Sequence, residues 1–464
     1  MSYILKLEKM KKYIFIIFTI SPLVLRAQSA SEAIHIVENE VGYGARSLAM
    51  GGAFAPLGDG PAGMYWNPAG LADLKNGSLY FESYFLRYRN NTSYLEKLHV
   101  NPFNLSRFNG IGAIYPIATV RGSLVIGLGF NRIHHYDDLM SFSGYSNVNN
   151  GLEFPINVDG QLLNYRFDQG VQRYEKIMSN GARDQITFSF GVALSPDLAA
   201  GLSISRMTGG ESYDFEFLQQ DVADNFQEFP SDFMNYELFQ SLSTKTKAMN
   251  IRAGLKYNFS PLRFGFSVAL PYILACEENH GTQERLIFDN SDYSDAIQLG
   301  YYDYKILMPA TIDFGAALVT ESNLTISMAF RIQDWSKMQF NLKDFASDSD
   351  EYIILKNENE SIVEDYKNVS QLRFGGEYLF PLTSTFGCVV RFGLAYIPSP
   401  KTSGSEDKAV TSVGLGVPIY NRFIFDMAYL YSYQKKESSD AYVPSNVDEE
   451  INKNQFLFNL SYLF

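Results

Sequence analysis

The chain has 464 residues, of which 46% are hydrophobic, and its 51 acidic against 38 basic side chains give a formal net charge of −13. Such an acidic chain is a poor candidate for a nucleic-acid-binding protein, because that function needs clustered Lys and Arg. The two cysteines, Cys276 and Cys388, are too few for a disulfide framework.

Residues 1–27 are predicted to be a secretory signal peptide. Several lysines precede an apolar run at 13–25, and small residues follow it. The alternative is a transmembrane anchor, but this run is shorter than the roughly 20 apolar residues that span a bilayer as a helix. We therefore expect an exported protein.

Residues 28–76 are predicted to form a compact plug inside a larger shell. The stretch 42–72 is rich in Gly and Ala, which let one backbone approach another closely. Asp59 and Asn67 can each cap a short helical turn, and Pro68 stands at the first helical position after Asn67. Two or three short helical pieces are expected here.

The same stretch carries a family resemblance. The sequences A-R-S-L-A-M-G-G-A-F at 45–54 and Y-W-N-P-A-G-L-A at 65–72 resemble the N-terminal segment of the FadL/TodX-type outer-membrane transporters. In that family the segment plugs the lumen of a β-barrel. PorV-type shuttle barrels of type IX secretion share it, so the resemblance implies the architecture more than the substrate. The motif residues are Arg46, Gly51, Gly52, Asn67, Pro68 and Ala69.

From residue 77 to residue 464 the chain alternates apolar with polar or small residues, as at 249–259 and 324–332. Alternation places one apolar and one polar face on each strand. A soluble β-sandwich alternates too, but these segments are long and end in Tyr and Phe, which favours a membrane barrel. The sequence therefore predicts an all-β protein, a transmembrane antiparallel β-barrel of about 14 strands. The predicted strands are 78–88, 109–119, 122–137, 184–195, 199–217, 243–259, 262–278, 301–320, 323–341, 367–380, 384–398, 409–419, 422–436 and 453–464.

Short turns and long loops alternate between these strands, as in outer-membrane barrels. The even strand number predicts that both termini lie on the periplasmic side of the outer membrane of a Gram-negative bacterium. Membrane lipid and lipopolysaccharide would then surround the barrel.

The last strand ends in Phe464 and resembles the signal that the outer-membrane insertion machinery recognises. An ordinary amphipathic strand is the alternative. The sequence leaves the oligomeric state open, a monomer included.

Basic side chains on the polar strand faces are the candidate ligand-binding residues of the lumen. In an apolar cavity they could hold a fatty-acid carboxylate by charge-assisted hydrogen bonds. The alternative is an ion-pair network between wall and plug, and Arg46 fits either arrangement. The candidates are Arg252, Lys256, Arg331, Arg373 and Arg391.

Two further features each have two interpretations. Pro271 and Pro309 lie inside neighbouring predicted strands, where proline removes a ladder donor. They mark either a local opening in the wall or a simple bulge. The loop at 218–242 is rich in Phe, and it either covers an apolar capture groove or packs on itself.

No catalytic residue, metal site or cofactor is predicted. The chain has no Gly-x-Ser-x-Gly and no His-Glu-x-x-His, and the acidic stretch 344–351 lacks the pattern of a calcium loop. His134 and His135 are adjacent, so on a regular strand they would face opposite sides. The resemblance implies passive uptake of a hydrophobic small molecule, such as a long-chain fatty acid or an aromatic hydrocarbon. The alternative is a PorV-like barrel that docks secreted proteins.

Overall fold

The computed structural model describes most of the chain from residue 42 onward. The predicted signal peptide at 1–27 lies outside the described residues. The described residues are 33, 35, 42–149, 151–158, 161–227, 232–290, 293–381, 387–403, 406–420, 422–439 and 446–464.

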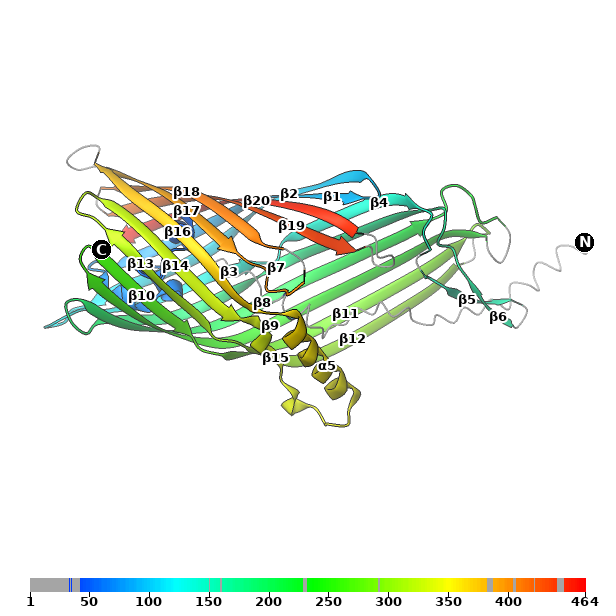
Figure 1. Cartoon of the computed structure of the whole chain (residues 1–464), viewed down its shortest axis with the longest axis horizontal. Coiled ribbons are helices and arrows are strands. Elements are labelled where there is room, and N and C mark those ends of the chain that lie inside the picture. Colours follow the sequence, from blue (N-terminus) through cyan, green and yellow to red (C-terminus); the bar gives the residue numbers. More distant parts are fainter. Residues whose placement is uncertain are drawn as a thin grey trace, which may run out of the picture.

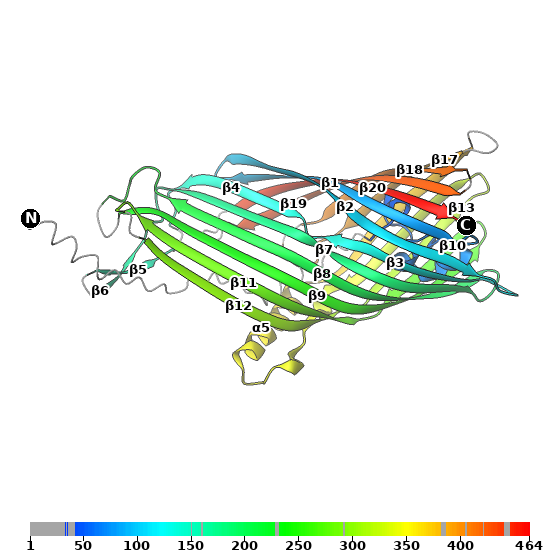
Figure 2. The same cartoon turned by 180° about the vertical axis from the view of Figure 1, so that it is seen from behind.

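The chain forms a closed antiparallel β-barrel of fourteen strands, which confirms the predicted fold class (Figures 1 and 2). The first strand, β1 (Ser78–Tyr94), pairs with β2 (Lys97–Ile117) and with the last strand, β20 (Asn446–Leu463), and this pairing closes the barrel. Four of the fourteen strands are interrupted and carry two labels: β3 (Leu124–His135) with β4 (Asp138–Ser146), β10 (Leu262–Ala269) with β11 (Tyr272–Phe288), β13 (Thr311–Val319) with β12 (Tyr293–Met308), and β14 (Leu324–Asp334) with β15 (Gln339–Phe340). The remaining barrel strands are β7 (Val171–Ala193), β8 (Leu198–Gln220), β9 (Phe233–Phe259), β16 (Asn368–Pro381), β17 (Gly387–Ile397), β18 (Lys408–Ile419) and β19 (Phe423–Ser439).

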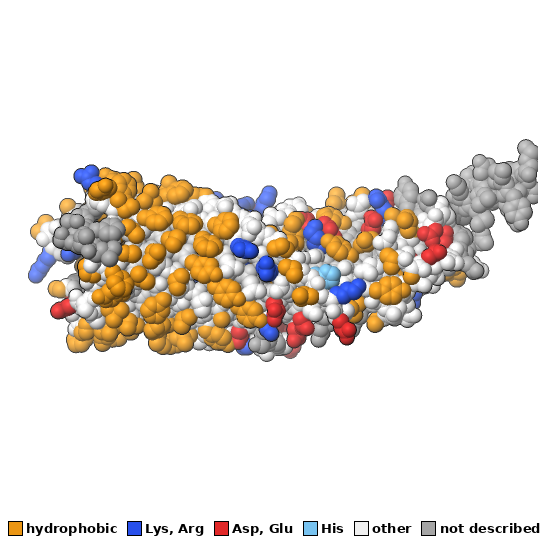
Figure 3. All heavy atoms as spheres, turned by 90° about the horizontal axis from the view of Figure 1, so that it is seen from above, with side chains coloured by type: hydrophobic (Ala, Val, Ile, Leu, Met, Phe, Trp, Pro, Cys, Tyr) orange, Lys and Arg blue, Asp and Glu red, His pale blue; other side chains and the backbone are white. Residues whose placement is uncertain are grey.

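The burial of side chains is the reverse of that in a soluble protein. On β9, Met249, Leu255 and Phe259 are exposed, whereas Arg252 and Lys256 between them are buried. A dense field of hydrophobic side chains covers the outer surface near one end of the barrel (Figure 3). A closed barrel with an apolar outside suits a bilayer, because strand pairing satisfies most of the backbone groups.

The strands are longer than predicted at one end of the barrel. The expected loop at 89–108 is a continuation of β1 and β2 to a tight turn at Leu95 and Glu96, both with positive φ. Beyond residue 88 β1 carries polar side chains on both faces, namely Arg89, Asn90, Asn91 and Thr92, so the alternation stops there although the backbone pairing continues. We call this end the long-loop end, and the opposite end, where Phe464 lies, the short-turn end.

A helix, α5 (Asp350–Asp365), stands where only an acidic loop is predicted at the long-loop end. The Ser349 side chain accepts from the Tyr352 N–H and caps the helix. Its two buried residues, Leu355 and Ile362, belong to one apolar cluster with Tyr304 of β12. Two apolar anchors in sixteen residues are too few to give a helical pattern in the sequence. Two 3-10 turns, η2 (Trp335–Lys337) and η3 (Leu342–Asp344), precede α5. None of the described helices is long and apolar enough to cross a membrane.

The plug consists of three short helical pieces in the lumen near the short-turn end (Figure 1). They are α3 (Ala45–Ala49), α4 (Gly63–Trp66) and the 3-10 helix η1 (Pro68–Asp73). The Asn67 side chain accepts from the Ala69 N–H at 3.1 Å, as expected of a cap. The expected cap at Asp59 is wrong, because α4 begins after Ala62 without a side-chain cap. The Asp59 carboxylate instead binds Arg46.

Small wall residues let the plug backbone lie directly on the strands. A Cβ added at Gly265 would stand 2.0 Å from the Ala55 carbonyl oxygen, and one at Gly254 would stand 2.1 Å from the Asn67 side chain. Wall serines donate hydrogen bonds to plug carbonyls between these contacts. The pairs are Ser203–Met64 (2.8 Å), Ser267–Trp66 (2.7 Å), Ser327–Ala53 (2.6 Å) and Ser412–Ala49 (3.0 Å).

We predict that Gly265→Val displaces the plug while the barrel still forms. Valine favours strands, but its Cβ would collide with plug backbone, which cannot yield locally. Ion conductance of the variant in planar lipid bilayers should rise severalfold above wild type. Gly281→Val is the control, because a Cβ there meets only side chains at 3.3 Å and beyond. Equal conductance of Gly265→Val and wild type would show that the plug is not docked through this contact.

Candidate ligand-binding site

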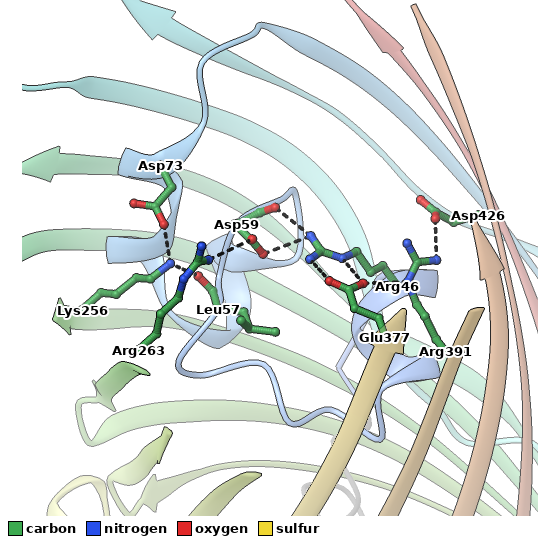
Figure 4. Close-up of polar contacts among 9 residues, drawn as sticks. All are labelled: Arg46, Leu57, Asp59, Asp73, Lys256, Arg263, Glu377, Arg391 and Asp426. Carbon is green, nitrogen blue, oxygen red and sulfur yellow. Dashed lines mark hydrogen bonds and ion pairs between the residues drawn. The ribbon is translucent and has the colours of Figure 1, made fainter. Parts of the chain in front are cut away.

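Each charged side chain of the plug stretch 42–74 pairs with a charge on the barrel wall (Figure 4). Arg46 lies 2.6 Å from Glu377, and Asp59 lies 3.6 Å from Arg263. Asp73 lies 2.5 Å from Lys256, whose ammonium group also donates to the Leu57 carbonyl at 2.6 Å. The plug is therefore fixed by charge on several sides.

Arg46 is the centre of a chain of ion pairs that crosses the lumen. Its guanidinium binds Asp59 of the plug at 3.0 Å as well as Glu377 of β16. Glu377 also accepts from Arg391 of β17 at 3.0 Å, and Arg391 lies 2.7 Å from Asp426 of β19. The chain links the plug to strands on opposite sides of Arg46 (Figure 4).

A second charged cluster lies on the long-loop side of the plug. Arg252 and Arg331 share the buried carboxylate of Asp313, at 2.5 Å and 2.7 Å. Arg331 also donates to the Tyr65 hydroxyl of the plug at 2.9 Å. Arg373 lies beside this group, with its guanidinium 4.9 Å from the Trp66 ring.

Arg373 differs from the other four candidate residues in its partners. It donates to the Gln371 side chain at 2.7 Å and to the Gly51 carbonyl at 3.4 Å. Within the described part of the chain it makes no ion pair, and its buried Nε has no acceptor. The predicted residues thus all face the lumen. Four of them form ion pairs with carboxylates, as in the ion-pair alternative: Arg252, Lys256, Arg331 and Arg391.

Two cavities lie on opposite sides of the plug. A cavity of about 40 Å³ on the long-loop side is lined by Arg252, Arg331 and Tyr65 together with apolar side chains. It holds little more than a water molecule. A chamber of about 660 Å³ lies at the short-turn end, between the charged chain around Arg46 and apolar wall residues such as Leu379. The second volume is in the range of small-molecule sites.

The wall has a gap between β2 and β4. Within the described residues, β2 pairs with β3 only from Gly110 onward, and it forms no ladder with β4. Inward side chains of β1 and β2 instead bond to the backbone of β4. Thr92 donates to the Ser141 carbonyl at 2.7 Å, and Asn101 donates to the same oxygen at 3.1 Å. Strand β4 therefore lies on the lumen side of the wall.

Arg107 of β2 bridges this gap toward β7. Its guanidinium donates to the Gly181 carbonyl at 2.8 Å and to Asp137 at 2.5 Å. A register shift between Arg132 and His134 accompanies the interruption of β3. A cavity at this interruption is lined by both His134 and His135.

The other predicted wall feature is a bulge. Pro271 and Pro309 both lie at strand interruptions, but Ala269 still pairs with Thr311 and Tyr272 with Met308. The ladder therefore resumes at once on both sides, in agreement with the bulge alternative.

The aromatic loop packs on itself at the long-loop end. Phe167 and Phe233 stack at 4.7 Å between ring centroids, and both are fully buried. They belong to a cluster with Phe154 of the small hairpin formed by β5 (Phe154–Val158) and β6 (Gln161–Tyr165). This arrangement fits the self-packing alternative.

Among the residues that the structure covers, no His, Cys, Asp or Glu side chains gather as metal ligands.

We predict that Asp313→Asn lowers the free energy of unfolding by about 3–5 kcal/mol, because two buried guanidinium groups lose their shared counter-charge. Asp344→Asn is the matched control, since its pair with Lys305 is exposed and should contribute less than about 1 kcal/mol. Urea unfolding of the detergent-solubilised barrel measures both. Equal effects of the two substitutions would contradict the structural role of Asp313.

No family model matches the sequence, and no curated protein matches it. Several solved structures do match the barrel. The Pseudomonas putida toluene transporter TodX superposes with a TM-score of 0.58 at 12% identity, over 92% of this chain and 99% of that chain. The Ralstonia pickettii toluene transporter TbuX gives 0.55 at 15% identity, over 92% and 100%. A Pseudomonas aeruginosa FadL homologue gives 0.55 at 13% identity, over 92% and 98%.

These matches span nearly the whole of each protein, so they concern the complete barrel with its plug region rather than a shared hairpin. Sequence identities this low establish the fold alone. The alternative role in docking secreted proteins gains no support from these matches. The resemblance first read from the plug motif is thus confirmed by the structure, and the chain has the fold of the FadL/TodX-type channels.

Proposed function

We propose that the protein is an outer-membrane channel for the passive uptake of hydrophobic small molecules, such as long-chain fatty acids or aromatic hydrocarbons. The fold that it shares with the toluene transporters supports this function. The observation that carries the proposal is the combination of a tightly docked plug with a gap in the wall between β2 and β4. In this arrangement the short-turn end, where the C-terminal Phe464 lies, faces the periplasm, whereas Ala33 and His35 lie on the long-loop side of the plug.

The ligand enters at the long-loop end and leaves sideways through the gap. A path through the plug would break its ion pairs with the wall together with the serine hydrogen bonds and the close glycine contacts that hold its backbone. Opening the gap requires only the separation of side-chain hydrogen bonds such as Thr92–Ser141, worth about 0.5–1.5 kcal/mol each. Burial of apolar ligand surface, at about 25 cal/mol per Å², offsets these costs.

Arg373 is the residue that we propose to contact an acidic ligand group. It is buried, donates to Gln371, which lines the small cavity on the long-loop side, and makes no ion pair within the described residues. The cavity is small in this conformation, so a ligand must displace side chains such as Tyr272 and Trp335 that line it. The other predicted basic residues would hold the plug.

A disulfide across the gap tests the sideways route. Asn101 and Ser141 hydrogen-bond to each other across it, so Asn101→Cys with Ser141→Cys should cross-link on oxidation. The native thiols are first removed by Cys276→Ala and Cys388→Ala. We expect oxidation to slow uptake of a radiolabelled long-chain fatty acid or of toluene into proteoliposomes at least tenfold, and reduction to restore it.

The control is a cross-link where the wall is already continuous. Gln172 and Gln220 are direct partners in the ladder of β7 and β8, so a cysteine pair there should leave uptake unchanged. Uptake that is equally fast in the oxidised and reduced gap variant would refute the sideways route. If wild-type protein neither takes up these compounds nor yields an apolar molecule on extraction and mass spectrometry, the proposed function itself is wrong.

A further inference from the structure

The outer surface of the barrel carries an aromatic groove where β20, β1 and β2 lie side by side. The groove has a volume of about 740 Å³ and is open along its length. Its apolar lining comes from outward side chains of these three strands: Phe81, Phe85, Phe108, Phe456 and Phe458. It is distinct from the lumen, because these side chains stand on the apolar outer face of the wall.

A β-bulge produces the hollow. The register between β1 and β2 shifts between Glu82 and Ser83, where Gly110 and Phe108 are the successive partners on β2. The extra residue, Asn109, turns inward and donates to Glu82 at 2.6 Å. Such a bulge re-aims the neighbouring side chains and bends the strand. Phe108 is therefore directed outward, next to Phe81 at 5.5 Å between ring centroids.

Two exposed arginines stand directly beyond the groove toward the long-loop end. Arg87 and Arg89 are the next outward positions on β1 after Phe85, roughly 7 Å and 14 Å further along the strand. Figure 3 shows basic side chains where the dense field of hydrophobic side chains ends. On the outward face of β1 the two arginines directly follow the aromatic positions Phe81 and Phe85, so we place them where lipid head groups replace acyl chains.

The cross-strand neighbours of these arginines carry no negative charge. Arg87 lies opposite Asn104 of β2 and Asn454 of β20. Arg89 lies opposite Pro102 and Asn452 in the same two strands. In the described part of the chain neither guanidinium makes an ion pair. Elsewhere on the outer wall basic side chains have acidic neighbours, as in the pairs Arg132–Asp184 and Lys247–Glu277.

We propose that this groove and the two arginines form a binding site for a phosphorylated, multiply acylated lipid of the outer leaflet, that is, for lipopolysaccharide. The acyl chains lie against the phenylalanines, and a phosphate of the head group binds Arg87 and Arg89. Guanidinium groups bind phosphate by paired, charge-assisted hydrogen bonds. The asparagines supply neutral donors for the sugar. No carboxylate stands directly opposite either arginine, and Glu450, diagonal to Arg89, pairs with Lys435, so both arginines are available to the phosphate.

The experiment compares lipid binding to the intact, delipidated barrel in detergent. Bisphosphorylated lipid A is added, and native mass spectrometry measures the fraction of protein that carries it. The test variant is Arg87→Gln with Arg89→Gln. The matched control is Arg206→Gln with Lys245→Gln, which removes two exposed basic residues of β8 and β9 that have no aromatic groove beside them. The heat-dependent gel shift of folded barrels verifies folding of every variant.

We expect the test variant to carry at least tenfold less lipid A than wild type and the control variant to carry the wild-type amount. Dephosphorylated lipid A should bind wild type and the test variant equally weakly. Equal lipid A binding by wild type and the test variant would overturn the proposal. Displacement of lipid A by an excess of fatty acid or toluene would also overturn it, since the groove would then belong to the exit path of a transported compound. None of these outcomes depends on whether the barrel transports anything.

Discussion

The pairing of plug charges with wall charges inside a closed barrel is the constraint on which the rest of the structure depends. Arg46, Asp59 and Asp73 are partly buried beside the chamber at the short-turn end, and each has an opposite charge on a strand. An unpaired charge there would be costly, so the plug has one favourable position. The hydrogen bonds from wall serines and the close approach at wall glycines then fix its backbone.

This position of the plug determines where a molecule can pass. The short-turn end is blocked by backbone-to-backbone contact and by the chain of ion pairs from Arg263 to Asp426. The wall between β2 and β4 is held only by side chains, because the interruption after His135 moves β4 to the lumen side. A barrel normally has no sheet edge. An interrupted strand restores one locally, here between β2 and β4.

The outer surface has its own local feature, which also arises from a bulge. The extra residue in β2 hollows the wall beside Phe108, and the arginines of β1 stand at the edge of the apolar field. Irregularities in β-ladders thus create both unusual sites of this barrel. One of them faces the lumen, and the other faces the surrounding lipid.

The sequence by itself determined the architecture. Alternation at 249–259 and similar segments fixes which side chains face lipid, because successive residues of a strand point to opposite sides. The cap at Asn67 and the helix start at Pro68 also follow from local chemistry. The same alternation correctly placed Arg252, Lys256, Arg331, Arg373 and Arg391 in the lumen.

Strand ends above the membrane, helix α5 and the gap could not be predicted. Beyond residue 88 both faces of β1 are polar, and only two residues of α5 are buried. Only the tertiary structure decided which carboxylate each basic group meets, since Arg252 of β9 reaches Asp313 of β13 across the intervening strand β10.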